Sequence, residues 1–152
     1  MERSGEAGFN LIEVMIALGL LAAVLISVSG LFAIGARHVE SGRNSSQALA
    51  AGRTILEEMS RWPPRRCYQA FGFDGSATSY SADSRTNDFA TRWQPLLSSR
   101  LSGGHATIHL ESLGPGSAPP FMSASRAIRV LVTVSWDEGP RRRTLRLGTV
   151  TM

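Results

Sequence analysis

The longest apolar stretch of the chain lies near its N-terminus. From Val14 to Ala36, 23 consecutive positions carry no charged side chain. A helix of that length reaches roughly 35 Å, and the hydrocarbon core of a bilayer is about 30 Å thick. The stretch therefore predicts a membrane-spanning helix. It is too long for an ordinary secretory signal, and the residues before it are not clearly basic.

The helical pattern continues beyond this stretch in amphipathic form. Apolar or small residues recur at spacings of three and four on one face of the helix: Val39, Ala48, Leu49, Gly52, Ile55, Leu56 and Met59. The helix should end at Trp62, because Pro63-Pro64 cannot continue it. We therefore expect one helix from roughly Leu11 to Arg61, whose second half offers one face to a sheet.

The remainder, residues 63–152, predicts a small head. Residues 63–104 are expected to form a loop, with Tyr68, Phe71 and Phe73 in contact with the core and a short helix around Thr91 to Leu101. An antiparallel sheet should follow over about residues 105–151.

Three strands are predicted in this sheet by alternating apolar and polar positions. The alternation is clearest from Ile128 to Trp136, and it is also present from Ala106 to Leu110. Asp137 to Pro140 predicts a turn, after which Thr144 to Thr151 returns as the second strand of a hairpin. The expected fold class is thus α+β.

Composition limits the function. The 152 residues include 16 arginines, no lysine and 12 acids, which gives a net charge of +4. After the apolar stretch, enough chain remains for one small core, which excludes a multi-domain enzyme. Cys67 is the single cysteine, so no intramolecular disulfide can form.

The residues that open the apolar stretch carry a more specific signal. They read Gly8-Phe9-Asn10-Leu11-Ile12-Glu13-Val14. A lone carboxylate inside a membrane costs about 2.5 kcal/mol or more, so Glu13 calls for a partner or for a position at the interface. Gly-Phe-x-Leu-Ile-Glu-Val before an apolar helix resembles the class III signal of type IV pilins and of type II secretion pseudopilins.

This resemblance implies a processing site and an assembly contact. A prepilin peptidase would cut between Gly8 and Phe9, remove the leader of residues 1–8 and N-methylate Phe9. Residues 9–36 would form the transmembrane and filament-core helix, and residues 37–62 its amphipathic second half. Glu13 would pair with the Phe9 ammonium of a neighbouring subunit; a role for Glu13 in processing alone stays open.

The resemblance also implies a fold and a function. The fold would be the pilin-like lollipop, a long N-terminal helix packed on a small antiparallel sheet. The closing hairpin, with Val132, Val134 and Trp136, resembles V-type minor pilins and the I-type pseudopilin. We therefore expect a non-enzymatic minor pilin or pseudopilin that primes or joins filament assembly and needs no cofactor.

The partners that the resemblance implies are the prepilin peptidase, sibling major and minor pilins or pseudopilins, and the inner-membrane assembly platform. The subunit would cross the bacterial inner membrane once, with a periplasmic head, before it enters a pilus or pseudopilus. Arg37, His38 and Arg43 follow the apolar stretch, while the leader has only Arg3. The positive-inside rule alone favours the opposite orientation. The resemblance implies a cytoplasmic leader and a periplasmic head, because the leader must face a peptidase on the cytoplasmic side.

Two other function classes stay open. One is a single-span membrane anchor that carries a periplasmic binding module. The other is a pilus-displayed subunit that binds DNA or a surface through two clusters of arginines, the pair Arg65-Arg66 and the triplet Arg141 to Arg143. Nucleic acid is not the expected partner, because such clusters are more often solvated faces or turns.

Candidate catalytic or metal-binding chemistry is sparse. His38, His105 and His109 are scattered, and strand positions 105 and 109 stand about 13 Å apart, too far to share a metal. We expect them at the surface and predict no metal site. The acids Asp74, Asp83 and Asp88 do not have EF-hand spacing and are expected as solvated loop residues. Cys67 is expected as a small buried residue.

Overall fold

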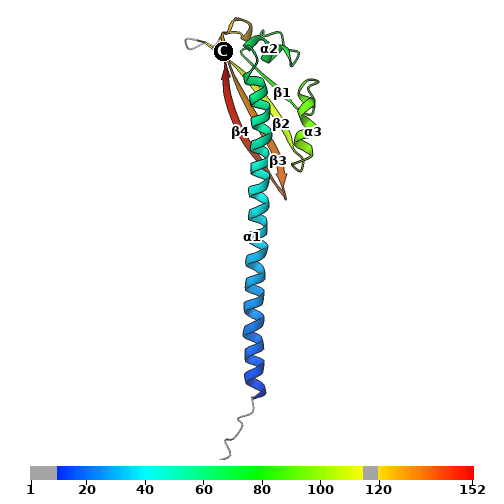
Figure 1. Cartoon of the computed structure of the whole chain (residues 1–152), viewed down its shortest axis with the longest axis vertical. Helices are drawn as coiled ribbons and strands as arrows, with labels where there is room; N and C mark the ends of the chain where they lie inside the picture. The colour runs from blue at the N-terminus through cyan, green and yellow to red at the C-terminus, as the bar shows by residue number, and fades with distance from the viewer. Residues whose placement is uncertain (1–9, 115–119) are drawn as a thin grey trace, which may run out of the picture. The chain divides into compact units, whose positions relative to one another are not determined.

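The computed structural model describes residues 10–114 and 120–152 (Figure 1). By its internal contacts the chain divides between Glu40 and Ser41 into two compact units. Gly8 and Phe9, the expected cleavage and methylation residues, lie outside the described residues.

Helix α1 runs from Leu11 to Ser60, close to the predicted bounds. The Asn10 carbonyl accepts the first backbone bonds of the helix, from the amide of Glu13 at 2.9 Å and that of Val14 at 3.2 Å, and its side-chain Oδ1 accepts from the amide of Ile12 at 3.5 Å. At the other end Trp62 N donates to Met59 O at 3.0 Å, and the two prolines follow. The predicted stop at the prolines is therefore confirmed.

The head contains one four-stranded antiparallel sheet in the order β1-β2-β3-β4. The strands are β1 Ser79–Asp83, β2 His105–Leu113, β3 Ala127–Glu138 and β4 Arg141–Thr151. The three predicted strands are confirmed. Strand β1 was not predicted, because it lies in a serine-rich segment that was expected to be a loop; it pairs with β2 from Ser79↔Glu111 to Asp83↔Thr107.

One face of the sheet and the second half of α1 form the core (Figure 1). The residues predicted to point inward are buried, and they include Ile108, Val130, Val132, Val134 and Trp136. A Cβ added to Gly52 of α1 would stand 2.6 Å from Leu147 and 3.4 Å from Val134, so the helix backbone lies close to β3 and β4. The α+β fold of a long N-terminal helix against an antiparallel sheet is thus observed.

Short helices cover the rest of the core. Pro63-Pro64 stops α1 but also opens α2, Pro64–Gln69, because proline fits the first helical turn. The helix predicted around Thr91 to Leu101 is confirmed as a 3-10 turn, η1 Ala90–Trp93, followed by α3 Gln94–Ser98, with Pro95 in its first turn. A further 3-10 turn, η2 Met122–Ala124, precedes β3.

Candidate functional site

The most prominent surface feature is the apolar half of α1. Its large apolar side chains, from Leu11 to Val39, are each between 40% and 76% exposed. No residue of α1 before Ala48 is buried. Soluble monomers rarely expose so large a contiguous apolar surface, and one of this size marks contact with a membrane or another protein. The helix is also long and apolar enough to cross a bilayer.

The few polar groups in this half of the helix are satisfied within it. The Ser27 hydroxyl donates to Ala23 O at 2.9 Å, and the Ser29 hydroxyl donates to Leu25 O at 2.8 Å. Each serine therefore brings no unpaired donor to an apolar environment. A Cβ at Gly19, Gly30 or Gly35 would meet no atom within 4 Å, so nothing in the described chain packs on these glycines.

Glu13 is the one charged residue of α1 before Arg37. It lies in the first turn of the helix and is exposed. A carboxylate in the first turn interacts favourably with the helix dipole. No ion pair of Glu13 occurs among residues 10–114 and 120–152. Its expected partner, Phe9, is outside this part of the chain, so the pairing stays a prediction.

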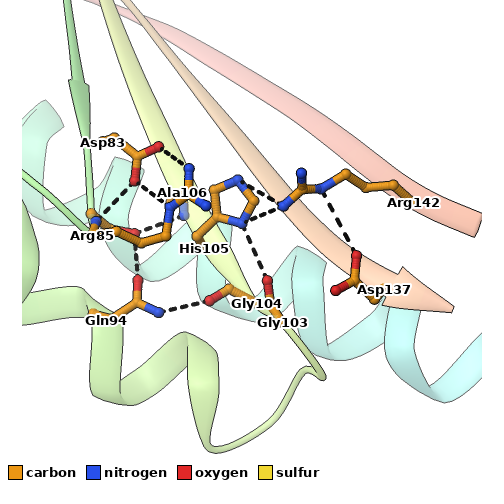
Figure 2. A network of polar contacts seen from close by, with 10 residues as sticks. Asp83, Arg85, Gln94, Gly103, Gly104, His105, Ala106, Asp137 and Arg142 are labelled. Atoms are coloured by element: carbon orange, nitrogen blue, oxygen red, sulfur yellow. Dashed lines mark hydrogen bonds and ion pairs between the residues drawn. The ribbon is translucent and has the colours of Figure 1, made fainter.

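A cluster of polar side chains lies where strands β1, β2 and β3 meet the loop that precedes β2 at Gly103 and Gly104 (Figure 2). His105 is only 6% exposed, which corrects the prediction of a surface histidine. Its Nδ1–H donates to Gly103 O at 3.2 Å, and Nη2 of Arg142 lies 3.4 Å from its Nε2. Arg142 reaches it from β4, so the arginine covers the ring.

Neighbouring bonds hold the same loop to the sheet (Figure 2). The Ser84 hydroxyl donates to Gln94 Oε1 at 2.6 Å, and Gln94 Nε2 donates to Gly104 O at 2.8 Å. The amide of Ala106 in turn donates to Ser84 Oγ at 2.9 Å. These mutually satisfied groups fix the start of β2.

Asp83 lies on a strand and not in a solvated loop, which is a further correction. Arg85 holds its carboxylate with two bonds, Nε to Oδ1 at 3.0 Å and Nη2 to Oδ2 at 2.8 Å. This side-chain hydrogen bonding keeps the pKa of Asp83 below its ordinary value, against the opposing effect of burial. Asp83 therefore binds Arg85 at the end of β1.

The remaining candidates for a functional site are the cysteine, possible metal ligands and a hollow at the surface. Cys67 is fully buried, as predicted, and desolvation raises its pKa to about 11. Within the described ranges, no three His, Cys, Asp or Glu side chains come together as a metal site would require. An open hollow of about 320 Å³ lies beside α2 and η2 and is lined by polar side chains that include Arg65, Gln69 and Asp74.

The basic clusters are divided between the two ends of the sheet. Arg66 of α2 stacks over the Trp62 ring at 5.1 Å. At the opposite end, Arg143 Nε lies 2.7 Å from Glu138 Oε2, and Arg142 Nε lies 3.9 Å from Asp137 Oδ1. All of these arginines are exposed.

Comparison with known proteins adds no family to this picture. A scan against protein-family models and searches of curated proteins and of solved structures found no match to this chain. The class that its fold defines is an α+β protein in which a long helix, apolar near the N-terminus, packs by its second half on a four-stranded antiparallel sheet.

Proposed function

We propose that this chain is a pilin-like assembly subunit, a minor pilin or a type II secretion pseudopilin. It is non-enzymatic in this proposal, and its role is to prime or join a filament at the inner membrane. The prepilin peptidase, sibling subunits and the assembly platform are its proposed partners.

The observation that carries this proposal is the uncovered apolar half of α1. Its uncharged length matches a bilayer, and none of its large side chains is buried by the part of the chain that the structure describes. The same surface suits lipid before assembly and neighbouring helices afterwards, because both surroundings are apolar. The Gly8–Glu13 motif at its start distinguishes this proposal from a plain membrane anchor.

Glu13 supplies the specific step in this proposal. Its carboxylate would accept the charge-assisted hydrogen bond of the processed Phe9 ammonium on the adjacent subunit. In a low-dielectric filament core each charge would satisfy the other, whereas either one alone would be costly. The apolar surface would supply association, and this pair would set the axial register.

Filament incorporation of two charge-neutral variants tests this step. Glu13→Gln should lower the amount of the subunit in sheared filaments by at least about tenfold, because one unpaired ammonium would remain in the core. Glu57→Gln, which removes an exposed acid from the second half of the same helix, should leave incorporation unchanged. Equal incorporation of both variants would overturn the proposed pairing.

The two rival functions give other outcomes. A single-span anchor with a binding module would retain residues 1–8 and stay in the membrane fraction. A pilus-displayed DNA-binding subunit would be incorporated, but it would also bind an oligonucleotide in a salt-dependent, saturable manner that depends on Arg65-Arg66 and on Arg141 to Arg143.

A further inference from the structure

The end of the head that follows the apolar helix carries a cluster of exposed arginines. We call this end the proximal end and define it by Ser41–Arg43, the loop Arg100–Gly104 and the turn Asp137–Arg143. The three segments are held together by two contacts. Asp137 N donates to Ser102 O at 2.8 Å, and the Ser41 side chain lies close enough to Glu138 to hold the pKa of that carboxyl below its ordinary value.

Charge at the proximal end is predominantly positive. It holds five exposed arginines: Arg43, Arg100, Arg141, Arg142 and Arg143. Only two acids, Asp137 and Glu138, stand among them, and each is already engaged by one arginine. Arg43, Arg100 and Arg141 have no ion pair in the part of the chain that the structure describes. A net positive surface therefore faces outward.

The sequence tethers this surface to the apolar stretch. Ser41 follows Ala36 by five positions. Even a fully extended connection of that length spans at most about 18 Å, and a helical one spans about 8 Å. The headgroup layer outside the hydrocarbon core is itself about 5–8 Å thick, and charges act over a Debye length of about 8–10 Å. The longest possible tether to Ser41 is thus comparable to the headgroup layer and one Debye length taken together, about 13–18 Å.

We propose that the proximal end docks on anionic phospholipid headgroups of the membrane that α1 spans. The arginines would bind lipid phosphates through charge-assisted hydrogen bonds. This inference rests on the proposed membrane anchoring. It adds a surface that would hold the head down before assembly and that would have to be released when the subunit leaves the membrane.

Lipid fits this cluster better than nucleic acid does. Base stacking needs exposed aromatic rings, whereas Trp136, the aromatic residue of the neighbouring β3 strand, is 4% exposed. The cluster also adjoins the membrane-spanning stretch in the sequence. Phosphate groups are therefore presented to it at high local concentration by the bilayer itself.

Hydrogen exchange of the full chain in lipid nanodiscs tests the proposal. One set of discs contains phosphatidylcholine alone, and the other includes about 30% phosphatidylglycerol. Amides of residues 137–143 should exchange at least about threefold more slowly in the anionic discs at about 50 mM salt, and the difference should vanish at about 500 mM. Equal exchange in the two discs at low salt would overturn the docking.

Matched double variants identify the arginines responsible. Arg100→Gln with Arg141→Gln should abolish the slowing. Arg61→Gln with Arg65→Gln removes the same charge at the other end of the head, where Thr151 of β4 bonds Trp62, and should preserve it. A loss of the slowing in both pairs would contradict a site at the proximal end.

Carbonate extraction separates this inference from the proposed function. A chain that resists extraction but exchanges equally in both discs refutes only the docking. A chain that carbonate removes from membranes refutes the anchoring and the docking together.

Discussion

The hydroxyl of Thr151 donates a hydrogen bond to the carbonyl of Trp62 at 2.6 Å, and the contact is buried. Thr151 is the last residue of β4, and Trp62 follows the end of α1. The bond therefore joins the last strand to the segment just after the helix on which the sheet packs, across 89 positions of sequence.

Removal of this hydroxyl should destabilise the head. Thr151→Val keeps the side-chain shape but leaves a buried carbonyl without its donor, which costs about 1–3 kcal/mol of unfolding free energy. Urea unfolding of the detergent-solubilised chain, followed by tryptophan fluorescence, measures it. Thr149→Val, at a half-buried position of the same strand, is the control and should change stability by less than about 0.5 kcal/mol.

The close approach of α1 to the sheet makes Gly52 sensitive to size. Gly52→Val should destabilise the head by about 1–3 kcal/mol, because the added methyl groups would meet Leu147 and Val134. Gly42→Val introduces the same side chain where nothing lies within 4 Å, and should change stability by less than about 0.5 kcal/mol. Similar costs at both glycines, in the same unfolding assay, would contradict the packing described.

Sequence patterns predicted the elements whose signals are local. The helix over Leu11–Ser60 and the strands β2, β3 and β4 follow from the periodicity of their own side chains. Strand β1 was not predicted, because only Tyr80 and Ala82 of its five residues face the core. Two positions are too few to establish an alternating pattern.

The burial of His105 could not be predicted from the residues around it in the sequence. The residue that covers it, Arg142, lies 37 positions away on β4. Its burial therefore depends on strand order and register, which no local pattern specifies. The candidate assembly residues differ in this respect, because Gly8, Phe9 and Glu13 form one short motif that can be read without the fold.

The Asp83–Arg85 pair should appear in the acid dependence of stability. The pKa of Asp83 is depressed when the protein is folded, mainly by its hydrogen bonds to Arg85. This stabilisation is complete above the unfolded pKa of about 3.9 and is lost as the pH falls through the lower folded pKa. Arg85→Gln should raise the pKa of Asp83 and flatten the loss of stability below about pH 4.

Carboxyl NMR titration of Asp83, with unfolding measured at each pH, checks this prediction. Arg61→Gln serves as the control, since it removes one exposed arginine elsewhere in the head. An unchanged Asp83 titration in Arg85→Gln would contradict the assigned cause.

The thiol of Cys67 should be almost inert in the folded chain. Burial raises its pKa to about 11, and at pH 8 the thiolate would be about 200-fold scarcer than for an ordinary cysteine thiol near 8.5. A colorimetric disulfide reagent should therefore react at least about 100-fold more slowly with the folded protein than with the urea-unfolded protein. Comparable rates in the two states would show that the thiol is accessible.

The intact mass of the protein shows whether the chain is processed as a pilin-like subunit. The protein would be purified from cells with and without a prepilin peptidase. We expect loss of residues 1–8 and the gain of one methyl group on Phe9, only when the peptidase is present. A full-length, unmethylated chain under both conditions would contradict the account and favour a single-span membrane anchor.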